Sequence, residues 1–154
     1  MLALSRNIFP ALLFSIAVCA CSSGQLEYTR VEDHDGAIAI PLKAVNNGDV
    51  HFFTYKYSGT NINFFVRMDG KGSLHTHFDA CLTCFRFRKG YVVEGVEIVC
   101  RECKRKFMLK DEKWSNQDTC IPIDIDSEIT KDTLVIKKET IIKGERYFTR
   151  RTNQ

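Results

Sequence analysis

The feature that most constrains this chain is a pair of C-x-x-C motifs. Cys81 and Cys84 form the first motif, and Cys100 and Cys103 form the second, which begins sixteen residues after Cys84. Two residues between the cysteines allow one tight turn to direct both sulfurs at the same ion, so two such motifs can complete a tetrahedral four-thiolate site. Neither motif is followed by His, which argues against covalent attachment of a c-type haem.

Three kinds of thiol chemistry compete for these four cysteines and for a fifth, Cys120. Structural disulfides would leave one of the five thiols unpaired. Bridges within a C-x-x-C motif would close loops too small to constrain the unfolded chain much. Dithiol exchange requires a C-x-x-C at a helix N-terminus, but residues 85–90 are short and strand-like. A four-thiolate zinc site contributes about 10 to 16 kcal/mol in small zinc modules and explains the paired spacing, so we favour metal.

The N-terminal part of the chain predicts export and membrane attachment. Residues 1–20 have the length of a signal peptide, and their apolar run is too short to span a bilayer. The sequence Val18-Cys19-Ala20-Cys21 resembles a bacterial lipobox, which predicts lipidation of Cys21. We expect residues 21–36 to form a tether and the domain to be exported, lipid-anchored and periplasm-facing. A net charge of only +3 and the predicted export argue against nucleic acid as a partner.

Beyond the tether, the chain is expected to form one small domain over residues 37–154. No stretch has sustained helical periodicity, while short runs rich in β-formers alternate with turn signals, so the expected fold is mostly β with short antiparallel strands. The strands that we expect cover residues 37–42, 50–57, 62–68, 73–78, 91–93, 97–99, 133–138 and 140–148.

Charged and histidine side chains surround the motifs. Seven basic residues lie between Cys81 and Phe107, and nearby cations stabilise a negatively charged thiolate centre. On a strand, His75, His77 and Asp79 would project from one face just before Cys81. We expect that face to be exposed, and the alternative is that the two histidines bind metal.

The motifs together resemble the FtrD-like family of membrane iron-sulfur-containing proteins. The resemblance covers roughly residues 37–148 and is carried by Asp79-Ala80-Cys81 with Cys84, Lys89-Gly90-Tyr91, Glu94-Gly95, the second C-x-x-C with Val99, and Cys120-Ile121-Pro122, with His51-Phe52 and Phe64-Phe65 upstream. Members of this family usually have Gly after the second motif, where Lys104 stands here.

The resemblance implies a periplasm-facing domain with an iron-sulfur centre, associated with ferrous-iron uptake or with a membrane permease or redox partner. It carries the ligand roles over to Cys81, Cys84, Cys100 and Cys103, with Cys120 as a fifth position. A chain exported unfolded cannot carry a preassembled cluster, so mononuclear zinc or iron is the alternative cofactor.

Two functional hypotheses follow. In the first, the domain transfers electrons or handles metal for a membrane partner such as an iron-uptake system. In the second, it is an interaction module around a structural zinc ion. We find no nucleophile-base pair or paired carboxylates at convincing spacing, so we expect a metal-binding or electron-transfer protein rather than an enzyme.

Overall fold

The computed structural model describes residues 26–114 and 119–149. The expected signal peptide, residues 1–20, and the lipidation candidate Cys21 lie outside the described residues. Within the two described ranges, no helix is both long enough and apolar enough to cross a bilayer.

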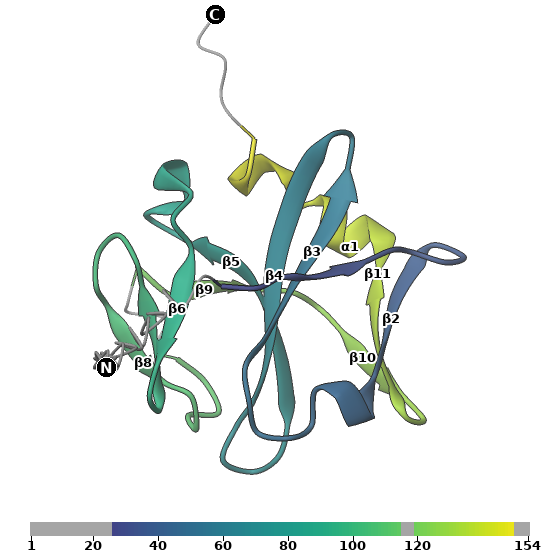
Figure 1. Cartoon of the computed structure of the whole chain (residues 1–154), viewed down its shortest axis with the longest axis horizontal. Coiled ribbons are helices and arrows are strands. Elements are labelled where there is room, and N and C mark those ends of the chain that lie inside the picture. The colour runs from purple at the N-terminus through teal and green to yellow at the C-terminus, as the bar shows by residue number, and fades with distance from the viewer. Residues whose placement is uncertain (1–25, 115–118, 150–154) are drawn as a thin grey trace, which may run out of the picture.

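Three sheets make up the domain, as the sequence predicts for a mostly β protein (Figure 1). The main sheet has the order β1-β3-β4-β5-β9 and consists of β1 Thr29–Val31, β3 His51–Tyr57, β4 Thr60–Met68, β5 Leu74–Cys81 and β9 Pro122–Asp124. The second sheet has the order β10-β11-β2 and consists of β10 Glu128–Thr130, β11 Thr133–Lys137 and β2 Ala37–Pro41. The third has the order β6-β7-β8 and consists of β6 Tyr91–Glu94, β7 Glu97–Cys100 and β8 Lys106–Met108.

The helical elements are short. They are the 3-10 turns η1 Leu42–Ala44, η2 Phe85–Phe87 and η3 Glu145–Tyr147 and the α-helix α1 Lys138–Ile142. All pairings between named strands are antiparallel except that of β1 with β3. The absence of helical periodicity from the sequence agrees with a longest described helix of only five residues.

Adjacent residues of a strand point to opposite faces of a sheet. In the main sheet, each face carries buried aromatic residues that belong to a separate core. Phe53 and Phe64 are cross-strand partners and face the core shared with β2, β11 and α1. Phe52 and Phe65 are also partners and face the core shared with the third sheet and the cysteines. At these positions a second layer of the fold therefore covers each side of the main sheet.

Strand β1 lies within residues 21–36, where a tether was expected. Thr29, Arg30 and Val31 pair in parallel with Phe53, Thr54 and Tyr55 of β3. Residues 29–31 thus belong to the main sheet rather than to a tether. Three residues with mostly exposed side chains give too short an alternation to be recognised as a strand.

The strand expected over residues 140–148 is wrong. This segment contains the end of α1 and η3, and Gly144 lies between them. A side chain at Gly144 would overlap the ring of Phe78 in β5, so glycine allows the backbone to pack directly on that ring. The β-branched and aromatic residues that suggested a strand instead cover the main sheet, with Ile141 and Tyr147 buried in its core.

The turn between β4 and β5 is stabilised by the side chain of Asp69. Its Oδ1 accepts hydrogen bonds from the N–H groups of Lys71 (2.8 Å) and Ser73 (2.9 Å). Its Oδ2 lies 2.8 Å from Nε2 of His75. These contacts, the bond to His75 first, lower the pKa of Asp69 to about 2.

We therefore expect Asp69→Asn to remove part of the acid sensitivity of folding. Asp69 has a folded pKa below its unfolded value, so its stabilising contribution is present above about pH 4 and is lost as the pH falls towards 2. The variant should unfold at lower urea concentration at neutral pH and lose less of its stability between about pH 4 and pH 2. Urea unfolding of reduced, metal-free protein measures this, with the exposed Asp126→Asn as control. Parallel pH profiles for the variant and the original chain would contradict the assignment.

Candidate metal centre

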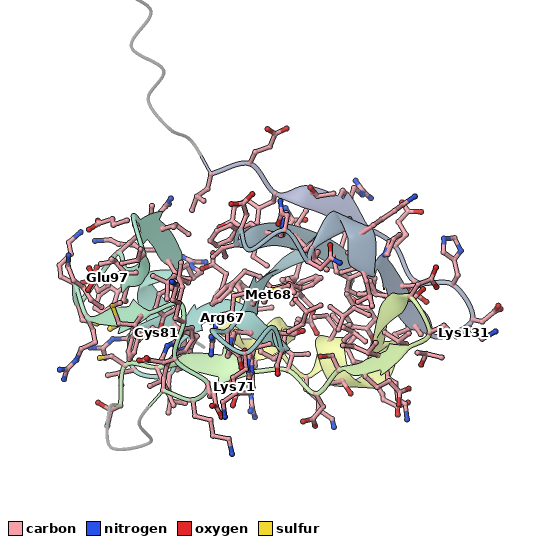
Figure 2. All side chains as sticks on the ribbon, turned by 90° about the horizontal axis from the view of Figure 1, so that it is seen from below. Arg67, Met68, Lys71, Cys81, Glu97 and Lys131 are labelled. Atoms are coloured by element: carbon pink, nitrogen blue, oxygen red, sulfur yellow. The ribbon has the colours of Figure 1, made fainter. Side chains whose placement is uncertain are left out.

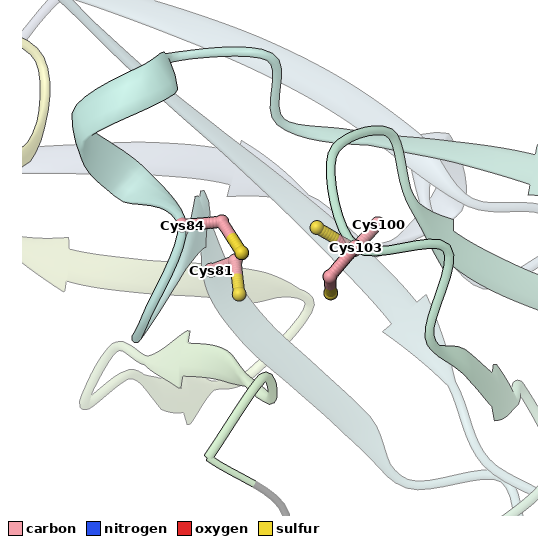
Figure 3. Close-up of side chains that lie close together, drawn as sticks. All are labelled: Cys81, Cys84, Cys100 and Cys103. Carbon is pink, nitrogen blue, oxygen red and sulfur yellow. The ribbon is translucent and has the colours of Figure 1, made fainter.

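The four cysteines of the two C-x-x-C motifs converge in the folded domain. Their sulfur atoms all lie within 4.8 Å of one another. Figure 3 shows Cys81 and Cys84 on one side and Cys100 and Cys103 on the other, with their sulfurs directed into the same space. The predicted pairing of the two motifs is thus what the structure shows.

Strand β5 and the turn after it position the first motif. Cys81 is the last residue of β5, and Cys84 immediately precedes η2. The carbonyl of Cys84 accepts the N–H of Phe87 at 2.9 Å, and the N–H of Leu82 donates to the carbonyl of Ile121 at 3.1 Å. The first bond closes the η2 turn, and the second holds the motif against the segment that leads into β9.

The second motif occupies the turn between β7 and β8. The N–H of Lys104 donates to the carbonyl of Cys100, and the N–H of Cys100 donates to the carbonyl of Arg105, both at 2.9 Å. Lys104 has a φ of 60°. This left-handed conformation is the one that glycine adopts most readily. Lys104 takes it up although it is not a glycine.

A buried carboxylate connects the two motifs. Asp79, two residues before Cys81, accepts the N–H of Tyr91 at 2.6 Å and the hydroxyl of Tyr28 at 2.5 Å. Tyr91 is the cross-strand partner of Cys100, so this contact fixes β5 relative to the strand pair that carries the second motif. Burial raises the pKa of Asp79 to about 6, although the Tyr28 hydroxyl and the Tyr91 N–H oppose this rise.

Gly90 allows this contact to form. Its φ is 64°, and a Cβ at this position would overlap the carboxylate of Asp79. Its carbonyl also accepts the N–H of Arg101 at 3.0 Å, within the second motif. The sequence pointed to Asp79 and to the Lys89-Gly90-Tyr91 segment only through the family resemblance. In the structure they form one contact, the Asp79 brace, which holds β5 against β6.

The four thiols differ in burial and in acidity. Cys81, Cys84 and Cys100 are buried, and Cys103 is the most exposed of the four. Burial raises the pKa of Cys84 and raises that of Cys100 to about 11. Burial acts in the same direction on Cys103, but the Arg105 N–H and neighbouring thiols outweigh it and hold its pKa at about 7. Because its pKa is lowered while theirs are raised, Cys103 ionises more readily than Cys84 and Cys100.

Cys120 lies beside the centre, outside the group of four converging sulfurs. Its thiol interacts with those of Cys103 and Cys81. Its carbonyl accepts the hydroxyl of Tyr91 at 2.7 Å and is 3.4 Å from the sulfur of Cys81. The backbone of Cys120 therefore helps to hold Cys81 and Tyr91 in place.

Among the seven basic residues near the motifs, some are neutralised locally and some are not. Lys89 pairs with Glu102 at 2.5 Å, and Lys106 pairs with Glu97 at 3.1 Å. Arg86, Arg88 and Lys104 are exposed, and no ion pair involves them in the part of the chain that the structure describes.

The two histidines of β5 do not join the sulfurs. His75, His77 and Asp79 share a face as predicted, but the expectation that this face is exposed is wrong, because His77 is 4% and Asp79 5% exposed. His75 bonds to Asp69 through Nε2. His77 accepts the Nε–H of Arg67 at Nε2 (3.3 Å) and directs Nδ1 at Asp124 (2.7 Å).

Arg67 is a buried cation that the sequence gives no reason to single out. It is 1% exposed, and its guanidinium lies 4.1 Å from the ring centroid of Trp114. It donates to the carbonyls of Leu109 (2.8 Å) and Asp111 (2.7 Å), which fixes the segment after β8 against β4. Figure 2 shows Arg67 and Cys81 in the same part of the domain. An Arg among alternating strand residues usually indicates a solvent-facing position, so its burial could not be predicted.

Comparison with known families identifies the chain. The model of the family described as membrane iron-sulfur containing protein FtrD-like matches residues 45–148. The chain belongs to the FtrD-like family. This FtrD-like match includes both C-x-x-C motifs, the Asp79 brace and Cys120, and it confirms the resemblance that the sequence motifs suggested.

Other comparisons add little to the family assignment. No curated protein sequence matches the FtrD-like chain significantly. Among solved structures, a quaternary ammonium Rieske monooxygenase, CntA, is similar with a TM-score of 0.45 and 12% identity. The similarity covers 65% of this chain and 30% of the monooxygenase chain. We draw no conclusion from a similarity at this level.

The Asp79 brace leads to a prediction for Gly90. Gly90→Ala should destabilise the domain by about 2 to 5 kcal/mol, because a left-handed alanine costs about 1 to 2 kcal/mol and the overlap with Asp79 adds about 1 to 3 kcal/mol. Gly95→Ala is the matched control, since Gly95 has a φ of 63° and no atom within 4 Å of its Cβ position. Urea unfolding measures both, and equal losses for the two variants would show that the Asp79 contact contributes nothing.

The ligand set leads to a second prediction. Cys100→Ser should lose roughly a quarter of the metal-binding free energy, about 3 kcal/mol, because a serine hydroxyl replaces a soft thiolate ligand. Cys120→Ser should keep the same amount of bound metal, because Cys120 lies outside the four converging sulfurs. Metal analysis after dialysis against a competing chelator compares the two variants. Loss of metal from Cys120→Ser and not from Cys100→Ser would contradict this ligand set.

Proposed function

We propose that this FtrD-like domain binds iron through Cys81, Cys84, Cys100 and Cys103 and uses this centre for electron transfer or metal handling at a membrane. The observation that carries the proposal is the convergence of the four sulfurs within 4.8 Å of one another. Thiolates are the ligands of iron-sulfur centres, and the family description names such a centre.

The donor set fits iron and zinc alike, since both bind thiolate readily. With a metal-sulfur bond of about 2.3 Å, four sulfurs around one tetrahedral ion lie about 3.8 Å apart. The four sulfurs lie within 4.8 Å of one another, about an ångström above that separation at most. In a cluster of several irons, the thiolates are divided among different metal atoms and lie farther apart. The spacing therefore favours a single iron with four sulfur ligands.

The position of the centre supports exchange with a partner. Cys103 is exposed, so one edge of the centre reaches the surface rather than being enclosed. The exposed cation of Lys104 follows it directly. Nearby positive charge stabilises the more negative, reduced form of a thiolate-iron centre and so raises its reduction potential.

Membrane attachment forms part of the proposal. The lipobox-like sequence that ends at Cys21 would place the domain on a periplasmic membrane surface, and a pair of acyl chains is sufficient for stable anchoring. A permease of an iron-uptake system is the partner we favour, since the family is described as membrane-associated. The lipid anchor would keep the exposed edge of the centre close to such a partner.

A structural zinc site is the second candidate, and one specific observation favours it. Cys81 ends β5 of the main sheet and Cys84 lies in the turn after it, whereas Cys100 ends β7 of the third sheet and Cys103 lies in the turn after that strand, so an ion would join two layers of the fold. Three of the four cysteines are also buried, as is common when the metal only stabilises the fold.

Metal and sulfide analysis of protein purified without oxygen tests the proposal. We expect iron bound to the four thiolates and visible charge-transfer absorption that changes on reduction and recovers on oxidation. Iron without acid-labile sulfide would identify a single-iron centre, and iron with equal sulfide a cluster, and both outcomes support the proposal. Colourless protein with one zinc per chain, after expression in iron-replete medium, would overturn it in favour of structural zinc.

A further inference from the structure

A basic cavity lies directly beside the first C-x-x-C motif. It has a volume of about 640 Å³, which is within the range of small-molecule sites. Its lining comes from the motif itself through Thr83, from η2 and the residue after it through Arg86 and Arg88, and from η3 through Arg146. Figure 1 shows η2 and η3 at the same end of the molecule, although about sixty residues separate them in the chain.

Among the residues that the structure describes, three arginines and no acidic residue line this cavity. Arg86 and Arg88 have no carboxylate partner within residues 26–114 and 119–149, and neither has Arg146. The neighbouring Lys89 differs, because it is paired with Glu102. The described residues therefore leave the positive charge of the cavity unbalanced, whereas Glu102 balances the charge of the neighbouring Lys89.

Aromatic rings hold two of the guanidinium groups. Arg86 lies 4.9 Å from the ring centroid of Phe87, and Arg146 lies 4.8 Å from that of Tyr147. Arg146 also donates to the hydroxyl of Tyr147 at 2.6 Å. Tyr147 is buried and packs edge-to-face on Phe85 at 5.3 Å between ring centroids. A guanidinium carries five N–H donors, so these contacts hold the two groups in place and still leave N–H donors available.

We propose that this cavity binds a small multivalent oxyanion, a dicarboxylate or a phosphate. Planar guanidinium groups bind both by paired, charge-assisted hydrogen bonds, and three of them around one cavity suit a ligand with at least two negative charges. Phe85 and Tyr147 supply apolar surface for the rest of the ligand. The bound anion would lie beside Thr83 and Phe85, which flank Cys84 in the chain.

This site does not depend on the identity of the metal. Its residues are held by the η2 turn, where the N–H of Arg88 donates to the carbonyl of Phe85 at 2.8 Å, and by η3, where the N–H of Phe148 donates to the carbonyl of Glu145 at 2.9 Å. The anion site can therefore fail its test while the metal centre passes, and the reverse is also true.

Isothermal titration of the full-length, metal-loaded chain tests the proposal, with succinate and inorganic phosphate as probes and acetate as the monovalent comparison. We expect saturable binding of at least one divalent probe, weaker binding of acetate, and loss of affinity as sodium chloride is raised. The probe that binds more tightly shows whether the cavity favours a carboxylate or a phosphate. Absence of saturable binding for both divalent probes would overturn the proposal.

The double substitution Arg86→Gln and Arg146→Gln should weaken binding by at least about tenfold, since each removes a charge-assisted donor. Lys43→Gln with Lys110→Gln is the matched control, because it changes the net charge equally at exposed positions outside the cavity. Arg88→Gln alone provides a milder variant if the first pair impairs folding. Metal content is measured in every variant. Equal weakening in the control pair would show only general attraction to a basic protein and would overturn the site.

Discussion

The structure depends on the contact between the buried carboxylate of Asp79 and the Gly90-Tyr91 segment. Asp79 lies at the end of β5, next to Cys81, and the segment that it binds begins β6, whose partner strand ends at Cys100. A single acceptor therefore sets the distance between the two halves of the metal site. Burying a carboxylate is unfavourable, and hydrogen bonds from Tyr28 and Tyr91 offset part of that cost. The contact persists because Gly90 leaves room for it.

The metal centre and the fold support one another. The main sheet and the third sheet share a core that includes Phe52, Phe65, Tyr91, Ile98 and three of the four cysteines. Apolar burial joins the two layers, and a four-thiolate ion would also join them at the point where their strands end. The exposed position of Cys103 means that this joint is also the place where the centre meets solvent.

The surroundings of the centre are organised by charge in two different ways. Lys89 and Lys106 are paired with glutamates, so their charge is largely balanced within the domain. Arg86 and Arg88, by contrast, line a cavity in which no described residue is acidic. Charge density alone, as counted from the sequence, does not separate these two groups of cations. Their difference depends on which glutamates the fold brings within reach, Glu102 for Lys89 and Glu94 with Glu97 for Lys106.

The sequence by itself determined the pairing of the two C-x-x-C motifs, the β-rich class and most hairpins, because each of these depends on local spacing. Some sequence features predict the same local structure whatever the rest of the chain does. They are the two residues between cysteines, the Asp69-Gly70 and Glu94-Gly95 turns, and the short runs of β-formers. Tertiary structure decided the rest. It placed α1 and η3 where a strand was expected, brought β1 into the sheet, buried His77 and Arg67, and set Cys120 beside the four sulfurs. These outcomes depend on which distant surface covers a residue, and no local pattern in the chain carries that information.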